Sequence, residues 1–251
     1  INFKLSGSND QINWIESDIY YCTNELFELD LSEYQYKLRF IKLDFLNNST
    51  EGIGINEIEV WGDNETVVNF ADTIFESYIR NLIQKPSGPI YQSDLYPINY
   101  IDIYNKRISS INEIIYCPNL EYLDCSYNSI RSLNLINNKK LIYLNITKTG
   151  IENIDLHNNK YLSYMLSKNS ALFNLDFSEN KYLKYLSCSG ADLKEIVFQN
   201  QKLLKTLILD YNIINNLNFE NSPNLKHLEL IYGEYDSINL TNLNNLEYLE
   251  I

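Results

Sequence analysis

Seven leucines recur in this chain at intervals of 21 residues, and each opens a similar phrase. Examples are LEYLDCSYNSI from Leu120 and LKTLILDYNII from Leu204. A fixed period of this length indicates stacked supersecondary units that bury their apolar sides against each other. The repeat therefore predicts a solenoid, which offers a long surface and few deep clefts. The seven residues are Leu120, Leu141, Leu162, Leu183, Leu204, Leu225 and Leu246.

Each repeat has its own apolar pattern, counted from the leucine as position 1. Apolar residues recur at positions 1, 4 and 6, and alternation with a period of two indicates a short strand. Further apolar residues at positions 11, 14 and 16 would return the chain behind the strand and close the coil. Position 9 is Asn128 or Asn212 in two repeats, where a buried amide can satisfy turn backbone groups. Any asparagine ladder there would be broken, because the other repeats lack an amide. They have Thr149, Ser170, Ala191 and Gly233.

This pattern resembles the leucine-rich repeat family in its short bacterial form, over residues 98–251. The resemblance implies a leucine-rich repeat solenoid with a parallel β-sheet on the concave face and an irregular convex side. Residues 98–119 would form a first repeat of 22 residues. The last strand phrase, from Leu246 to Ile251, has no closing cap, so we expect exposed apolar side chains there and a chain that is incomplete at its C-terminus or covered by another chain.

A stretch with helical spacing precedes the repeats, with apolar residues at Ile74, Phe75, Tyr78, Ile79 and Leu82. The phrase VNFADTIFESYIRNLIQKPSGPIYQSDL resembles the N-terminal cap of bacterial internalin-type repeat proteins. A cap is physically required because the first coil would otherwise expose its apolar end. Residues 64–97 are therefore predicted to be a linker and a short helical cap, and an ordinary interdomain helix is the alternative.

Residues 1–63 lack the period and contain dense β signals, including NFKLSG, YKLRFIKLDFL at 36–46 and GIGINEIEVWG at 52–62. The last two phrases, together with Trp14, resemble the closing part of a discoidin, or coagulation factor 5/8 type C, domain. The family's sandwich is longer, so this N-terminal all-β module would be a partial β-sandwich or a smaller β unit. A short antiparallel sheet that only caps the solenoid is the alternative.

The same resemblance raises a question about metal binding. In discoidin-like carbohydrate-binding modules, the glutamate that matches Glu57 often helps to hold a structural calcium ion. The loop that supplies the other ligands has no counterpart in this chain, and a glutamate at a strand end explains the residue equally well. We therefore predict neither a metal nor a cofactor.

The charge is strongly negative and unevenly distributed. The net charge is −13, and residues 1–66 hold 13 acidic and 4 basic side chains against 20 and 16 in the remainder. This balance argues against a nucleic-acid-binding protein, because such proteins carry a basic stripe. No apolar run is long enough for membrane insertion in this segment. We expect a secreted or cell-surface bacterial protein.

The cysteines are predicted to be unpaired. Cys125 and Cys188 share position 6 but lie three repeats apart, at about 14 Å, whereas a disulfide needs Cα atoms within about 7 Å. A bridge between Cys22 and Cys117 stays open. No pair of cysteines and histidines has zinc-site spacing.

Catalytic motifs are missing from the sequence. His157 lies in a polar turn, His227 faces outward from its strand, and no nucleophile elbow or phosphate loop occurs. Carboxylates such as Asp124, Glu229 and Glu250 are interpreted as an exposed face. The chain is therefore predicted not to be an enzyme.

The outward strand positions are the candidate binding surface, because positions 3, 5 and 7 alternate with the buried ones. Tyrosine combines a rigid ring and a hydroxyl at low entropic cost, which suits recognition. Stacking within the sheet, worth about 0.2–1 kcal/mol per pair, is an equally good explanation. The candidate ligand-binding residues are Tyr122, Tyr143, Tyr164, Tyr185, His227, Tyr248, Asp124 and Asn145.

These observations predict a non-enzymatic binding or adhesion protein that recognises protein or glycan on a host or neighbouring cell surface. A structural scaffold, or an accessory region of a larger secreted hydrolase, is the alternative.

Overall fold

The structure, a computed structural model, describes residues 2–8, 15–21, 40–45 and 66–251. The chain divides into two compact units, which are Ile1–Val67 with Tyr91–Pro97, and Val68–Ile90 with Ile98–Ile251. Within the described ranges, no helix is long and apolar enough to cross a lipid bilayer.

The first unit contains a three-stranded antiparallel sheet with the strand order β2-β1-β3. Strands β1 and β3 occur within two of the phrases that predicted strands. The third such phrase, at 52–62, lies outside the described residues, as do Trp14, Cys22 and Glu57. The elements of this unit are β1 (Asn2–Ser8), β2 (Ile15–Tyr21), β3 (Phe40–Phe45) and the short helix α2 (Gln92–Leu95).

The second unit begins with the predicted helix, α1 (Thr73–Leu82). Asp72 caps its N-terminus, because Oδ1 accepts hydrogen bonds from the backbone N–H groups of Ile74 (2.9 Å) and Phe75 (3.1 Å). Its other oxygen accepts from the backbone N–H (2.7 Å) and the hydroxyl (2.8 Å) of Ser109 in the first coil. One carboxylate therefore starts the helix and fastens it to the solenoid.

The buried face of α1 is narrow. Phe75 and Ile79, one turn apart, are buried. Ile74 and Leu82, which contribute to the helical spacing in the sequence, are 44% and 42% exposed. Two residues spaced i, i+4 suffice to bury one edge of a short helix.

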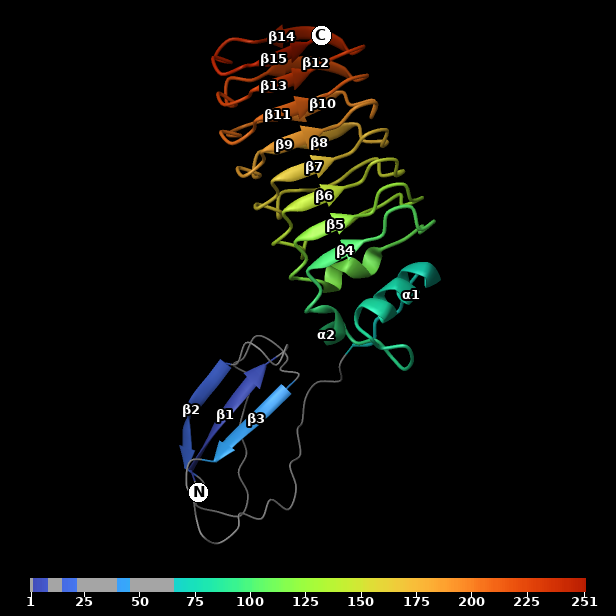
Figure 1. Cartoon of the computed structure of the whole chain (residues 1–251), viewed down its shortest axis with the longest axis vertical. Coiled ribbons are helices and arrows are strands. Elements are labelled where there is room, and N and C mark those ends of the chain that lie inside the picture. The colour runs from blue at the N-terminus through green and yellow to red at the C-terminus, as the bar shows by residue number, and fades with distance from the viewer. Residues whose placement is uncertain (1, 9–14, 22–39, 46–65) are drawn as a thin grey trace. The chain divides into compact units, whose positions relative to one another are not determined.

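The repeats form an eight-stranded parallel sheet, here called the main sheet, with neighbouring coils stacked along the solenoid (Figure 1). Each strand occupies positions 3 to 5 of its repeat, within the stretch whose alternation predicted a short strand. The first repeat also contains a 3-10 helix, η1 (Asn112–Tyr116). The strands are β4 (Tyr100–Asp102), β5 (Tyr122–Asp124), β6 (Tyr143–Asn145), β7 (Tyr164–Leu166), β9 (Tyr185–Ser187), β11 (Thr206–Ile208), β13 (His227–Glu229) and β15 (Tyr248–Glu250).

The interior confirms the predicted register. Leu144 and Leu186, at position 4, are completely buried, and so are Cys125 and Cys188 at position 6. These cysteines and Cys117 are free thiols. Burial raises the pKa of Cys188 to about 11, so this thiol stays protonated and packs as a small apolar group.

The last coil is less covered, as the sequence predicted. Leu246 is half-buried, Leu249 is 43% exposed and Ile251 is 66% exposed.

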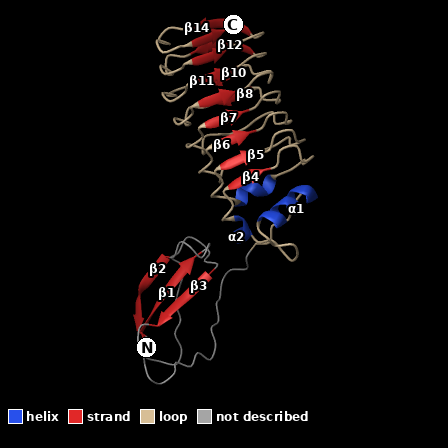
Figure 2. Cartoon of the chain, in the orientation of Figure 1, coloured by secondary structure: helices blue, strands red, loops and turns tan. Residues whose placement is uncertain are grey.

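The side of the solenoid opposite the main sheet is partly regular, which corrects the predicted irregular side. Two parallel strand pairs form there, in the repeats that begin at Leu162, Leu183, Leu204 and Leu225 (Figure 2). Coils of equal length place their extended segments side by side, where free backbone groups pair. The pairs are β8 (Asn174–Asp176) with β10 (Glu195–Val197), and β12 (Ile213–Asn218) with β14 (Glu234–Asn239).

The amides at position 9 act as predicted. The Nδ2 of Asn128 donates to the carbonyl oxygens of Ile103 (2.7 Å) and Cys125 (3.0 Å). Its Oδ1 accepts from the backbone N–H groups of Lys106 (3.1 Å) and Ile108 (2.9 Å). A single buried side chain thus satisfies four backbone groups of two neighbouring coils.

An asparagine ladder exists at another position, 19, which the sequence analysis missed. Asn138, Asn159 and Asn180 are completely buried on consecutive coils. The Nδ2 of Asn159, for example, donates to the carbonyl oxygens of Leu135 (3.1 Å) and Asn138 (2.9 Å). The ladder joins each coil to the preceding one at the turn that leads into the main sheet.

Truncation of the core should be costly. Leu144→Ala or Leu186→Ala should lower the free energy of unfolding by about 2–5 kcal/mol, through lost transfer energy and a cavity. Urea denaturation measures the change. Ile142→Ala is the control, because Ile142 is 40% exposed and its truncation should change stability by about 0.5 kcal/mol or less. An unchanged midpoint for Leu186→Ala would contradict the register.

Acid should weaken the cap. Burial alone would raise the pKa of Asp72, but the hydrogen bonds from Ser109, Phe75 and Ile74 outweigh burial and lower it. The stability that this carboxylate contributes is therefore present above its unfolded-state pKa and is lost as the pH falls through the lower folded-state value. Asp72→Asn should cost about 1–3 kcal/mol at neutral pH, since charge-assisted hydrogen bonds are lost.

Denaturant unfolding at several pH values tests this expectation. The difference in free energy of unfolding between the wild type and Asp72→Asn should disappear below about pH 4. The exposed Glu220→Gln serves as the control for a general charge effect. If the difference in free energy of unfolding is the same at neutral and acidic pH, the charge of Asp72 makes no contribution to stability.

Candidate functional site

The outward positions of the main sheet place one row of side chains along all eight strands. The residues at position 3 face each other directly across each parallel strand pair, so their spacing follows the strand spacing of about 4.8 Å. We call them the aromatic row, which consists of Tyr100, Tyr122, Tyr143, Tyr164, Tyr185, Thr206, His227 and Tyr248.

The first tyrosines of the row stack on each other. The ring centroids of Tyr100 and Tyr122 are 4.4 Å apart with an interplanar angle of 12°, and those of Tyr122 and Tyr143 are 4.3 Å apart at 4°. Both faces of the Tyr122 ring are thus covered by neighbours. A ligand could meet this ring only at its edge and hydroxyl, whereas the end ring, Tyr100, is 49% exposed.

Tyr100 was not among the predicted site residues. It lies at position 3 of the irregular 22-residue repeat, and the YID phrase aligned with YLD from Tyr122 could have revealed it.

The row is interrupted twice. Tyr164 and Tyr185 form a second, looser pair, with centroids 6.4 Å apart, and within the described repeats no stacked contact joins Tyr143 to Tyr164. Thr206 separates this pair from His227 and Tyr248, which stack at 4.4 Å and 11°. The row therefore presents three short aromatic groups rather than one continuous ladder.

The hydroxyls of Tyr122 and Tyr143 stay protonated at neutral pH. Burial raises the pKa of Tyr122 and of Tyr143, and the nearby Asp124 carboxylate adds to both shifts. A neutral phenol can donate and accept a hydrogen bond, so these groups suit a polar, uncharged feature of a ligand.

Asp124 and Asn145, two of the predicted ligand contacts, belong to one hydrogen-bond network. Asp124 is only 9% exposed, so its interpretation as an exposed carboxylate is wrong. Its Oδ1 accepts from the backbone N–H (2.9 Å) and hydroxyl (2.5 Å) of Ser126, and its Oδ2 accepts from Asn145 Nδ2 (2.8 Å). Asn145 Oδ1 in turn accepts from the backbone N–H of Thr147 (3.1 Å). This network holds the strand ends in place and supports the row above it.

The other end of the row is acidic. His227 Nε2 lies 2.5 Å from Glu229 Oε1, and the Tyr248 hydroxyl donates to Glu250. Burial raises the pKa of Asp210, and Glu229 and Glu250 add to the shift. The main sheet thus offers an aromatic surface at one end and a carboxylate-rich surface at the other.

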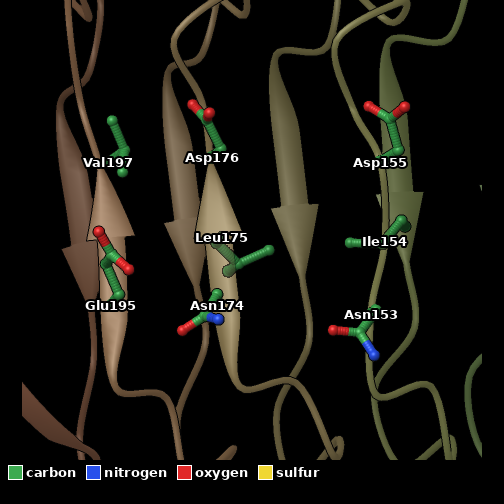
Figure 3. A pocket seen from close by; sticks show the side chains of 8 residues that line it. All are labelled: Asn153, Ile154, Asp155, Asn174, Leu175, Asp176, Glu195 and Val197. Atoms are coloured by element: carbon green, nitrogen blue, oxygen red, sulfur yellow. The ribbon is translucent and has the colours of Figure 1, made fainter.

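A shallow groove lies on the opposite side of the solenoid. Figure 3 shows Asp155 and Asp176 on neighbouring coils at one end of it, with Glu195 towards the other end. His157 bridges the two aspartates, with Nδ1 2.8 Å from Asp155 Oδ1 and Nε2 3.4 Å from Asp176 Oδ2.

His157 lies in the polar turn that the sequence analysis assigned to it and is exposed there, but the sequence analysis missed its two partners. The hydrogen bond to Asp155 raises the pKa of His157, and the surrounding carboxylates add to the shift. Across the parts of the chain that the structure describes, no group of three ligating side chains could hold a metal ion.

The Asp124 network should be measurable as stability. Asp124→Ala leaves the Ser126 N–H and the Asn145 amide without their acceptor, which should cost about 1–3 kcal/mol. Ser187→Ala is the control at the same repeat position, because Ser187 is half-buried and its loss should change stability by about 0.5 kcal/mol or less. Equal unfolding midpoints for the two variants would mean that the network carries no stability and leaves Asp124 available to a ligand.

Comparison with protein-family models gave no match, and comparison with curated proteins gave none either. Solved structures do match. An internalin C2 of Listeria monocytogenes has a TM-score of 0.52 at 20% identity, over 72% of this chain and 93% of its own. A leucine-rich repeat protein of Leptospira interrogans has a TM-score of 0.53 at 20% identity, over 64% of this chain and 46% of its own.

The functional domain of InlJ from Listeria monocytogenes has a TM-score of 0.49 at 23% identity, and this chain covers 50% of that domain's length. At such identities the likeness establishes the fold and nothing finer. Residues of the second unit form a leucine-rich repeat solenoid with a short helical cap, similar in fold to the Listeria internalin C2 and to the Leptospira leucine-rich repeat protein.

Proposed function

We propose that this chain is a non-enzymatic binding protein, secreted by a bacterium or held at its surface, which recognises a protein or glycan through the main sheet. The observation that carries the proposal is the aromatic row. Its rings are fixed by strand pairing and stacking, so little side-chain entropy remains to be lost when a ligand binds.

In the middle of the first tyrosine group, the geometry favours a protein partner over a sugar. Stacking covers both faces of Tyr122, and a sugar ring needs an open aromatic face. A ligand of this surface can contact ring edges, neutral hydroxyls and the carboxylates of Glu229 and Glu250. A partner with polar side chains opposite the tyrosines and basic ones opposite the carboxylates would match them.

Two further interpretations belong to the proposal. The resemblance of residues 1–63 to a discoidin-like module would add a glycan contact, and this rests on the sequence phrases alone. A scaffold role is the competing function, because the stack of Tyr100, Tyr122 and Tyr143 stabilises the sheet without any ligand.

A binding screen with the intact chain tests the proposal. Against arrays of cell-surface proteins and glycans, the chain should bind a ligand, and the double variant Tyr143→Ala with Tyr164→Ala should lose that binding while staying folded. The matched control is Tyr211→Ala with Tyr232→Ala, which removes another stacked pair, 5.0 Å apart, away from the row. Full affinity in a folded Tyr143/Tyr164 variant would move the site elsewhere, and the absence of any ligand would favour the scaffold.

A further inference from the structure

Half of the basic side chains of the solenoid unit lie along one edge. Residues 67–251 contain 16 lysines and arginines, and eight lysines occupy positions 20, 21 and 2 of successive repeats. These positions form the turn by which each coil enters the main sheet, and we call them the lysine edge. All eight are exposed, and they are Lys139, Lys140, Lys160, Lys181, Lys184, Lys202, Lys205 and Lys226.

We propose that the lysine edge binds an acidic polysaccharide, a linear chain of sulfated or carboxylated sugars. This site is separate from the aromatic row and does not depend on the function proposed for it.

The backbone fixes the spacing of the charges. The N–H of Lys205 donates to the carbonyl oxygen of Lys184 (2.9 Å), and the N–H of Lys226 donates to that of Lys205 (2.9 Å). The three lysines therefore stand on consecutive coils, about 4.8 Å apart. A repeating row of cations along a straight edge suits a repeating polyanion better than a single small anion.

Few of these charges are neutralised within the protein. Lys160 pairs with Glu179 (3.4 Å) and Lys226 with Glu247 (2.5 Å). In the described part of the chain, no ion pair is formed by Lys139, Lys181, Lys184, Lys202 or Lys205.

Carboxylates are missing from the edge between its two ends. At positions 20, 21 and 2, the sequence has Glu121 before the lysines and Glu247 after them, with none between. Like charges at this spacing repel each other, and a bound polyanion relieves the repulsion.

Exposed rings and aliphatic side chains stand among the lysines. Tyr161 and Tyr182 are 56% and 49% exposed, and Ile142 and Leu203 are both 40% exposed. A shallow groove is lined by Ile142 and the two tyrosines together with Lys140 and Lys184, and Glu121 is the one carboxylate in its lining. The C–H faces of sugar rings can pack on such a surface while the lysines meet the anionic groups.

Two features favour a polysaccharide over nucleic acid. The edge contains lysine but no arginine, whose planar fork is preferred for phosphate and bases. The rings of Tyr161 and Tyr182 already contact each other, with centroids 5.6 Å apart, so no base fits between them. Single-stranded nucleic acid is therefore the competing ligand in the test.

The test titrates the full chain with heparin, with polygalacturonate, with uncharged dextran and with an oligothymidylate, at low and at physiological ionic strength. Heparin or polygalacturonate should bind, with an affinity that falls as salt rises, and dextran should not. Heparin alone would assign a sulfated ligand, and polygalacturonate alone a carboxylated one. Absence of binding to both, or tighter binding to oligothymidylate, would overturn the proposal.

Matched triple variants localise the site. Lys184→Gln with Lys202→Gln and Lys205→Gln should weaken polysaccharide binding about tenfold or more, and Tyr161→Ala with Tyr182→Ala should weaken it further. The control, Lys106→Gln with Lys148→Gln and Lys194→Gln, removes equal charge elsewhere and should leave affinity within about twofold. An equal loss of polysaccharide affinity in both triple variants would show that binding depends on net charge alone and not on the lysine edge. The Tyr143/Tyr164 variant should bind the polysaccharide normally, which separates this site from the aromatic row.

Discussion

The backbone hydrogen bonds between consecutive coils are the constraint on which this solenoid depends. Each bond joins residues about one repeat apart, such as Ile146 N–H to the Leu166 carbonyl oxygen (2.8 Å) and Ser163 N–H to that of Ile142 (2.9 Å). A coil of constant length keeps these bonds in register on both sides of the solenoid. The same register turns every repeat position into a column of side chains at strand spacing. The aromatic row is one such column, and the lysine edge is made of three neighbouring ones.

The constant coil length requires a strained backbone conformation at one position of each repeat. Position 8 has a left-handed backbone in repeat after repeat, with φ of 57° at Tyr127, 53° at Lys148 and 55° at Tyr211. Glycine, which adopts this conformation freely, occupies the position only at Gly190 (φ 63°). The strain, about 1–2 kcal/mol per non-glycine residue, is offset because the same turn lets the Tyr127 N–H reach the Thr147 carbonyl oxygen at 2.8 Å.

Periodicity predicted the parts of the fold that depend on burial. The strand at positions 3 to 5, the buried column that contains Leu144 and Leu186, and the free cysteines follow from alternation and from a 21-residue spacing. The asparagine ladder at position 19 was equally periodic in the sequence, at Asn138, Asn159 and Asn180. It was missed because a polar residue in a polar turn looks solvent-exposed until the structure shows that its amide is buried against carbonyl groups.

The candidate site was less predictable because contacts between side chains decide it. Alternation along the strand placed Asp124 among the exposed positions, but the structure shows it buried. Ser126 and Asn145 donate hydrogen bonds to its carboxylate, and these contacts cannot be predicted from the pattern within one repeat. The pairing of His157 with Asp155 and Asp176 joins residues of two coils, and alternation within one repeat carries no information about it.

The columns also explain how the solenoid keeps positively and negatively charged side chains on different parts of its surface. A substitution at one repeat position changes one column and leaves the buried columns untouched, so each face can vary independently of the core. The lysines gather at the entry to the strands, whereas Glu229 and Glu250 lie on the main sheet and Asp155 and Asp176 on the opposite side. In a chain with a net charge of −13, scattered lysines would each find a carboxylate nearby. Their collection at three adjacent repeat positions leaves most of them without an ion pair in the described part of the chain, which is the arrangement that a polyanion would complement.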